Sequence, residues 1–354
     1  MVTMRNIAEQ VGVSISTVSL VLSDKDRGRV RSDIAQRIRQ AALELGYQPN
    51  RLASGLRTNH SRIIGFLSNE VATTPFAGRM LEGAQDAALA LGYMLLTINV
   101  HDNDRETDRE ITALKQYGTD GFIYARMFNQ STVLPAPLDG CRTVIANGTD
   151  AEGQAPSIIP DEYHIGLCAT NHLIETGCKR IAYIGTVHTM IAQSGRVAGY
   201  LDALSAHGIP FDPEIMINVD DGADAAARLP AFFNAHTDLD GFFCFNDTRA
   251  WGVYEEAAHR GLVIGKDIAV VGVDNHEVIA EAIDPPLSSV ELPHYEMGYW
   301  AVGKLVSMLQ GETPEPFPCA GYPINRAQLP PLTDNHAKIT CQLRIKQSWF
   351  RRRP

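Results

Sequence analysis

The sequence predicts an all-α N-terminal head followed by an α/β body made of two doubly wound parallel-sheet lobes. Helix-capping residues and apolar residues at helical spacing occur throughout the first 60 residues. From Arg62 onward, short apolar runs rich in β-branched residues alternate with helix-like segments. A length of 354 residues leaves room for two or three domains of roughly 100–200 residues each.

Three short helices are expected in the head. Thr3 can cap a helix that runs to about Val11, and Ser14 can cap the next, because short polar side chains accept hydrogen bonds from the amides of the first turn. A third helix should span roughly residues 33–45 and end at Gly46, since glycine readily takes the left-handed conformation at a helix end. The first two helices, joined by a tight glycine-containing turn, have the geometry of a helix-turn-helix.

The body should contain two series of strands separated by helices. The first series of apolar runs covers residues 63–67, 94–98, 121–124 and 143–146, and the second covers residues 181–185, 215–219, 241–245 and 268–273. Helix-like stretches between them cover residues 80–91, 166–176, 195–207 and 248–260. Strands that alternate with helices form parallel sheets covered on both faces. Two such series indicate two similar lobes, with ligand bound beyond the carboxyl ends of the strands.

The charge is unevenly distributed along the chain, whose formal net charge is -10. Residues 1–60 hold nine Lys or Arg and five Asp or Glu, and residues 333–354 hold six and one. The remaining 272 residues hold 16 and 35. A basic head on an acidic body is typical of a small nucleic-acid-binding module joined to a separate sensing or catalytic domain.

Several classes of protein are not expected. No apolar run reaches the ~18 residues of a membrane-spanning helix, and the polar residues 1–10 lack the apolar stretch of a signal peptide, which favours the cytoplasm. The six cysteines include no C-x-x-C pair, so we expect no zinc site, no other metal and no cofactor. The chain also lacks G-x-S-x-G, H-E-x-x-H and G-x-G-x-x-G, which argues against catalysis.

Two motifs in the head carry a specific family resemblance. The stretch I-A-E-Q-V-G-V-S-I-S-T-V-S-L-V-L-S (residues 7–23) is followed by L-G-Y-Q-P-N-R-L-A-S-G-L-R-T (residues 45–58). At this separation they closely resemble the lactose-repressor/galactose-repressor (LacI–GalR) family of bacterial transcriptional regulators. The resemblance extends to about residue 330 and implies a periplasmic-binding-protein-like body, in which the chain crosses between the lobes about three times.

The resemblance also implies where the domains begin and end. We expect a helix-turn-helix DNA-binding domain over residues 1–49, a hinge helix and linker over 50–60, and a two-lobed domain for effector binding and dimerisation over 61–332. Lobe one would comprise about residues 61–160 plus 293–321, and lobe two about residues 161–292 plus the segment after 321. The basic extension 333–354 has no counterpart in the family. We expect it to be disordered, with non-specific phosphate binding as the alternative.

In the family, the second helix lies in the major groove and a short hinge helix, here about residues 51–56, enters the minor groove. The resemblance therefore implies contacts to double-stranded DNA from Thr3, Ser14, Ile15, Ser16, Thr17 and Leu20 in the head, and from Asn50, Arg51, Ala53 and Leu56 in the hinge. Leu56 would be the apolar wedge that opens a central base step and kinks the DNA. Without the resemblance, Leu56 would be interpreted as a core leucine under a loop.

Three positions in the head and hinge affect how closely DNA binding follows the family. Leu20 stands where relatives often carry an arginine that reads guanine, whereas leucine can at best contact a thymine methyl group. Arg31 stands where relatives have a serine that caps the third helix, a role that Ser32 could take over. Gly55 should weaken the hinge helix by about 1 kcal/mol relative to alanine, which favours a hinge that folds only on DNA.

Five residues are expected to contact the effector: Phe76, Arg126, Arg196, Asn246 and Asp274. They lie at predicted strand ends or in stretches that resemble family signatures, among them Q-S-G-R-V-A-G-Y (193–200), F-N-D-T (245–248) and G-V-D-N (272–275). An arginine with an asparagine and an aspartate offers donors and acceptors for vicinal hydroxyls, and Phe76 could cover the apolar face of a sugar ring.

Structural roles are the alternatives at these positions. Asp247 is expected to cap the helix that follows it rather than to bind ligand. Asp274 could hydrogen-bond its own turn, and Arg196 could be a surface or salt-bridged arginine. Phe76 could equally belong to the core.

The expected function is sequence-specific DNA binding by a transcriptional regulator, most simply a repressor, that a small carbohydrate controls from between the lobes. A homodimer on a pseudo-palindromic operator is expected, since one three-helix head contacts few bases. A purine or another non-sugar metabolite is the alternative effector. The rival of another class is a solute-binding protein, which has no use for residues 1–60 and should carry an export signal. A sugar-modifying enzyme is the third alternative, which turnover of the effector would reveal.

Overall fold

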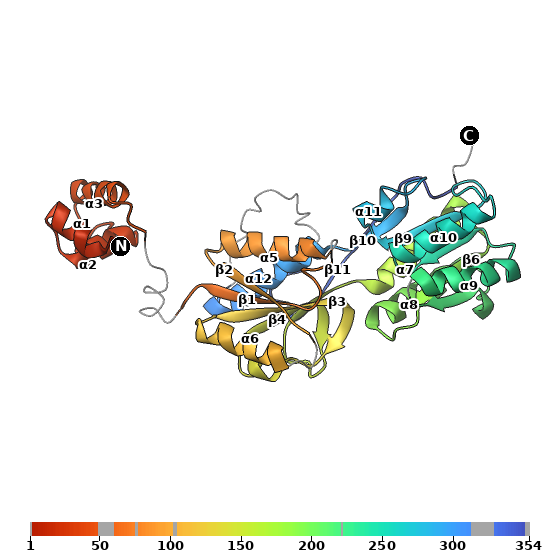
Figure 1. The fold of residues 1–354 in the computed structure, drawn as a ribbon, viewed down its shortest axis with the longest axis horizontal. Helices are drawn as coiled ribbons and strands as arrows, with labels where there is room; N and C mark the ends of the chain where they lie inside the picture. The colour runs from red at the N-terminus through yellow and green to blue at the C-terminus, as the bar shows by residue number, and fades with distance from the viewer. Residues whose placement is uncertain are drawn as a thin grey trace. The chain divides into compact units, whose positions relative to one another are not determined.

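The computed structural model describes residues 2–48, 60–74, 77–101, 105–220, 222–312 and 329–350. The chain divides into two compact units, Met1–Ser61 and Arg62–Pro354. The first is all-α and the second contains two six-stranded sheets, as the sequence predicts (Figure 1). None of the helices in the described parts of the chain is both long and apolar enough to span a membrane.

The head consists of α1 (Met4–Val11), α2 (Ile15–Leu22) and α3 (Ser32–Glu44), which confirms the three predicted helices. Their apolar faces meet in one core because the apolar residues recur every three or four positions. The buried members of this core are Ile7, Ala8, Val11, Val18, Val21, Ala35, Ile38, Ala41 and Ala42. The turn between α1 and α2 uses Gly12 in the left-handed conformation, with φ of 76°.

The caps of the head helices agree with the sequence at two of three sites. The Ser14 Oγ accepts a hydrogen bond from the Thr17 amide at 3.1 Å, so Ser14 caps α2 as predicted. Thr3 occupies the corresponding position of α1 and donates from its amide to the Asn6 Oδ1 at 2.9 Å. The prediction that Ser32 caps α3 is wrong. Arg31 holds the cap position, Ser32 is already helical, and the Arg31 Nη2 pairs with Asp33 at 2.9 Å.

Lobe one contains a wholly parallel sheet. Its strand order is β11 (His336–Ile339), β5 (Ser157–Pro160), β4 (Thr143–Asp150), β3 (Gly121–Thr132), β1 (Ile63–Ser68) and β2 (Met94–Asn99). Figure 1 shows α5 (Gly78–Ala90) and α12 (His294–Gln310) on one face and α6 (Arg105–Gln116) on the other. Separate apolar cores fill the two faces, which accounts for strands that are buried on both sides.

Lobe two repeats this architecture. Its order is β12 (Gln342–Arg344), β10 (Ser288–Glu291), β9 (Ala269–Asp274), β8 (Gly241–Cys244), β6 (Ile181–Thr186) and β7 (Met216–Val219), with only β12 antiparallel to its neighbour. The helices α7 (Glu162–Thr176) and α8 (Ile191–Ala206) pack on one face, and α9 (Gly222–Ala235) and α10 (Asp247–His259) on the other. The eight predicted strands are therefore present, although Ile215 belongs to the 3₁₀ turn Pro213–Ile215 that precedes β7.

The chain passes between the lobes at three places: from β5 to α7, from β10 to α12, and from β11 to β12. The first two lie close to the expected lobe boundaries at residues 160 and 293. The third corrects the assignment of the whole segment after residue 321 to lobe two. Strand β11 instead pairs with β5 and completes the sheet of lobe one, and only the residues after it join lobe two.

The expectation that residues 333–354 are disordered is wrong for residues 333–350. This segment supplies β11 and β12, and it alternates buried Ala337, Ile339 and Cys341 with exposed residues between them. Such alternation is the pattern of a strand with one face against a core. The net charge of the segment, set by its Lys and Arg residues, does not reveal this pattern.

This arrangement predicts that the two outer strands are needed for folding. A chain ended after residue 332 loses β11, β12 and the fully buried Ser348, which exposes apolar core in both lobes. We expect it to aggregate, or to unfold at a much lower temperature than the full chain. A chain ended after residue 350 is the matched control and should keep the circular-dichroism melting curve of the full chain. Equal melting curves for all three chains would contradict this account of the tail.

Candidate functional site

A pocket lies between the two lobes, beyond the carboxyl ends of their strands. Its lining residues from lobe one lie in the later parts of β3 and β4, and those from lobe two come from α7, α8, the turn before α10 and the end of β9. Two further residues come from the crossover between β10 and α12. Together the lining residues are Met127, Phe128, Asn129, Asn147, Glu162, Ala192, Arg196, Phe245, Asn246, Asp274, Leu292 and His294. This is the place where doubly wound sheets bind their ligands.

Arg196 is the central charge of the pocket and is paired within the protein. Its Nε lies 2.8 Å from the Glu162 Oε2, and the two side chains are only 4% and 5% exposed. The Arg196 Nη1 donates to the Phe245 carbonyl oxygen, and the guanidinium lies 4.4 Å from the centre of the Phe245 ring. The other Glu162 oxygen accepts a hydrogen bond from the Asn129 Nδ2 at 3.1 Å, which ties lobe one to the pair.

Burial and charge shift the pKa values of the groups around this pair. Burial alone would lower the pKa of Arg196, but the facing Glu162 carboxylate raises it above its ordinary value. Burial and repulsion from Asp247 raise the pKa of Asp274 well above its usual range. Burial, assisted by the positive charges of Arg196 and Arg79, lowers the pKa of His294 to about 4. His294 therefore faces the pocket as a neutral imidazole at pH 7.

The expectation that Asp247 caps α10 is wrong, because the preceding residue holds the cap position. Asn246 is the residue that caps α10, since its Oδ1 accepts from the Arg249 amide at 3.1 Å, and it also lines the pocket. Asp247 is not the cap. Its carboxylate accepts from the Ser289 Oγ at 2.6 Å and from the His276 amide at 2.7 Å. Burial raises the pKa of Asp247 to about 7 despite these two hydrogen bonds.

The structure brings Arg196, Asn246 and Asp274 together but places Arg126 elsewhere. The Arg126 side chain is buried, donates to the Tyr124 hydroxyl at 3.0 Å, and lines a separate hollow in lobe one with His101 and Arg105. A register shift between Ala125 and Gln130 in the β3–β4 ladder separates Arg126 from the residues that reach the pocket. Phe76 lies outside the described residues.

Among the pocket residues that were not predicted from the sequence are Glu162 and Asn129, which form the hydrogen bond between the lobes. Glu162 directly follows the first crossover and stands beside Asp161, the cap of α7. Acidic side chains commonly occupy the first turn of a helix, so the sequence does not distinguish Glu162 from them. Asn129 lies in the irregular part of β3, where it has a positive φ of 43°. No pattern in the chain marks such a position. The long stretch without an expected strand or helix after residue 124 is the only hint that β3 continues.

The candidate DNA-contacting residues of the head lie at the start of α2. Ile15 and Ser16 are exposed, and 47% of Ile15 is accessible, which is high for an isoleucine. Ser14 and Thr17 are bonded to each other at the cap, while Leu20 is half-buried one turn further on. An exposed first turn of the second helix is the part that reaches base edges in a helix-turn-helix. The expected hinge residues Asn50, Arg51, Ala53 and Leu56 lie outside the described residues.

Comparisons with known proteins agree with this organisation. Residues 3–50 match the model for bacterial regulatory proteins of the lacI family, and residues 61–317 match the model for periplasmic binding proteins and the sugar-binding domain of the LacI family. Among curated relatives, the regulator RegA of Clostridium saccharobutylicum is 32% identical over 87% of this chain and 92% of that protein. The sucrose operon repressor of Shigella flexneri is 28% identical over 90% of this chain and 98% of that protein.

Solved structures show the same architecture. The complex of the transcriptional regulator CelR with cellobiose superposes with a TM-score of 0.65 at 25% identity, covering 98% of this chain and all of that one. Two family models therefore cover the head and most of the body, and RegA exceeds 30% identity over most of the chain. This chain belongs to the LacI family of bacterial regulatory proteins and is a DNA-binding transcriptional regulator with a separate ligand-binding body.

Proposed function

We propose that this regulator is a repressor whose binding to operator DNA is controlled by a small carbohydrate held between the lobes. The observation that carries this proposal is the buried Arg196–Glu162 pair next to Asn246 and Asp274. A guanidinium, a carboxylate and an amide together offer both donors and acceptors, which is what adjacent hydroxyl groups require. A sucrose operon repressor and a regulator solved with cellobiose are among the similar proteins, which supports a carbohydrate.

The effector would act by changing the arrangement of the lobes. In the structure, Glu162 in lobe two accepts a hydrogen bond from Asn129 in lobe one, and Arg79 in lobe one pairs with Glu277 in lobe two at 2.8 Å. A polyol that hydrogen-bonds Arg196 and Asp274 competes with the first of these ties and favours a different separation of the lobes. Its effect on operator affinity can be no larger than its preference for one arrangement over the other.

Operator binding would use two heads. The first turn of α2 is short and exposed, so one head would contact few bases, and a homodimer on a pseudo-palindromic site in the cytoplasm is proposed. Linking two heads raises affinity without new contacts, because the second head binds intramolecularly. A hinge that folds only on DNA would then connect the arrangement of the lobes with the spacing of the heads.

Neutralising the central Arg196–Glu162 pair of the pocket should abolish the response of operator binding to effector. Arg196→Met alone would leave the buried Glu162 without its partner, so the variant also carries Glu162→Gln. A regulator of this class should lose operator affinity about 10-fold or more with effector, and the double variant should lose that response but keep its basal operator affinity. Fluorescence anisotropy measures both, on a duplex selected with the full-length protein from half-sites randomised around a central C-G step.

This experiment needs a control variant and a panel of candidate effectors. Arg180→Met removes an arginine that pairs with Asp212 at 2.8 Å outside the pocket, and it should leave the response intact. The panel contains mono- and disaccharides together with purine bases and nucleosides. A response to purines alone would replace the carbohydrate by the alternative effector. Loss of operator binding in the double variant would contradict the separation of the two activities.

Altering the exposed first turn of α2 should reduce the head's ability to discriminate between DNA sequences. Ile15→Ala together with Ser16→Ala should weaken the selected duplex by about 10-fold or more, because base-edge contacts supply discrimination. Binding to random DNA should change little, since phosphate contacts dominate it. Leu43→Ala is the control, because Leu43 is 78% exposed on α3 of the same head. Equal weakening on selected and random duplexes would show that α2 does not read bases.

A further inference from the structure

The turn that follows β9 is held in a costly conformation beside the pocket. Asp274, which lines the pocket, has φ of 105°, and the next residue, Asn275, has φ of 50°. Consecutive non-glycine residues with positive φ are strained, and such a turn persists only where its surroundings over-determine it. The surroundings of this turn therefore decide where the Asp274 carboxylate is held.

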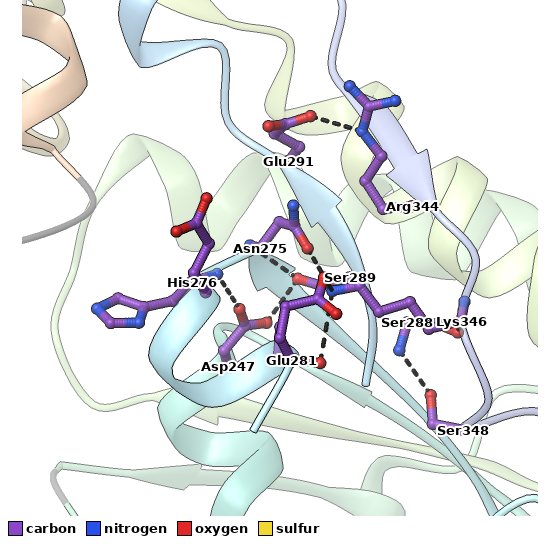
Figure 2. Close-up of polar contacts among 12 residues, drawn as sticks. Asp247, Asn275, His276, Glu281, Ser288, Ser289, Glu291, Arg344, Lys346 and Ser348 are labelled. Atoms are coloured by element: carbon purple, nitrogen blue, oxygen red, sulfur yellow. Dashed lines mark hydrogen bonds and ion pairs between the residues drawn. The ribbon is translucent and has the colours of Figure 1, made fainter. Parts of the chain in front are cut away.

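Lobe two holds the backbone of the turn through two hydrogen bonds. The Asn275 amide donates to the Ser289 Oγ at 3.0 Å, and the His276 amide donates to Asp247 at 2.7 Å. The Ser289 hydroxyl in turn donates to the same Asp247 carboxylate at 2.6 Å. Figure 2 shows that two of these bonds end on Asp247, while the third joins the Asn275 amide to Ser289. They fix the amides of the turn but leave the Asn275 side chain to another partner.

That partner is Lys346, which comes from the C-terminal segment. Its Nζ donates to the Asn275 Oδ1 at 2.6 Å and lies 2.9 Å from the Glu281 Oε1 (Figure 2). The short helix α11 (Glu277–Ala280) lies between these two residues, so one ammonium group ties both of its ends. The Lys346 side chain is 13% exposed and that of Glu281 is 57% exposed.

The backbone around Lys346 is itself anchored in the sheet of lobe two. The Lys346 amide donates to the Ser288 Oγ at 2.9 Å, and the Ser288 amide donates to the Ser348 Oγ at 2.8 Å. The Ser348 hydroxyl also donates to the Val270 carbonyl oxygen at 2.6 Å. Hydrogen bonds to β9 and β10 therefore fix the backbone around residues 346 and 348, from which the Lys346 side chain extends to the turn.

We propose that Lys346 is a positioning residue for effector recognition, holding the 274–275 turn so that the Asp274 carboxylate faces the pocket. Lys346 does not line the pocket itself, so it acts through Asn275. The inference rests on the proposed function of the pocket as an effector site. It gives the C-terminal segment a role in ligand specificity in addition to its role in the two sheets.

Amide hydrogen exchange tests the proposal on the full chain without any effector. In Lys346→Met the amides of residues 275 and 276 should exchange about 10-fold faster or more, because their local opening costs less. Lys304→Met is the matched control, since the Lys304 Nζ holds the Leu332 carbonyl at 2.9 Å and the Asn335 Oδ1 at 3.0 Å in lobe one. It should leave these two amides unchanged. Unchanged exchange in Lys346→Met would overturn the proposal.

Calorimetry with glucose, ribose, sucrose and cellobiose then tests recognition. For each sugar that binds the wild-type chain, Lys346→Met should weaken binding about 10-fold or more, whereas Lys304→Met should not. Operator affinity without sugar should be the same in both variants, and Lys346→Arg should restore sugar affinity because it keeps the charge and the donors. Unchanged sugar affinity in Lys346→Met would overturn the proposal. Failure of all four sugars on the wild-type chain would count against the carbohydrate effector, and the exchange result would still decide the role of Lys346.

Discussion

The buried pair of Arg196 and Glu162 is the interaction on which the pocket depends. Removing one partner of such a pair leaves an uncompensated charge that costs about 3–5 kcal/mol, so each residue requires the other. Close packing of α7 on α8 brings them together. A Cβ atom on Gly166 would lie 2.0 Å from the Arg196 carbonyl oxygen, and one on Gly199 would lie 2.1 Å from the Tyr163 carbonyl oxygen. Side chains at either glycine would separate the helices and move the two charges apart.

Because Arg196 and Glu162 are paired with each other, we propose that an effector binds by exchanging hydrogen bonds with them. The exchange involves both lobes, since Asn129 of lobe one bonds the same carboxylate that holds Arg196. A ligand that replaces the Asn129 contact therefore alters how the lobes are held. The opposite wall of the pocket has less freedom, because the strained turn at Asp274 is supported by β10, α10 and the C-terminal segment. We therefore propose that effector recognition combines one exchangeable hydrogen bond, from Asn129 to Glu162, with one rigid wall at Asp274.

Local patterns in the sequence predicted the elements well. The helices of the head and the strands of the body follow from apolar periodicity and caps, which depend on neighbouring residues alone. Arg196, Asn246 and Asp274 were expected from stretches that resemble family signatures, and only Asn246 and Asp274 also follow from strands that end at one edge of a sheet. Features set by distant residues were missed: the bulge that diverts Arg126, and the bond from Glu162 to Asn129 across the lobes. The outer strands of the tail were missed because each is only three or four residues long and lies among basic residues.

We propose that the pocket and the operator are coupled through one change in the arrangement of the lobes. The most direct measurement is effector affinity by calorimetry, for the free protein and for the protein saturated with operator DNA. Linkage requires the ratio of the two effector affinities to equal the ratio of operator affinities with and without effector. The account predicts an effector affinity that is about 10-fold or more weaker on the operator complex. Equal effector affinity for free and operator-bound protein would contradict it.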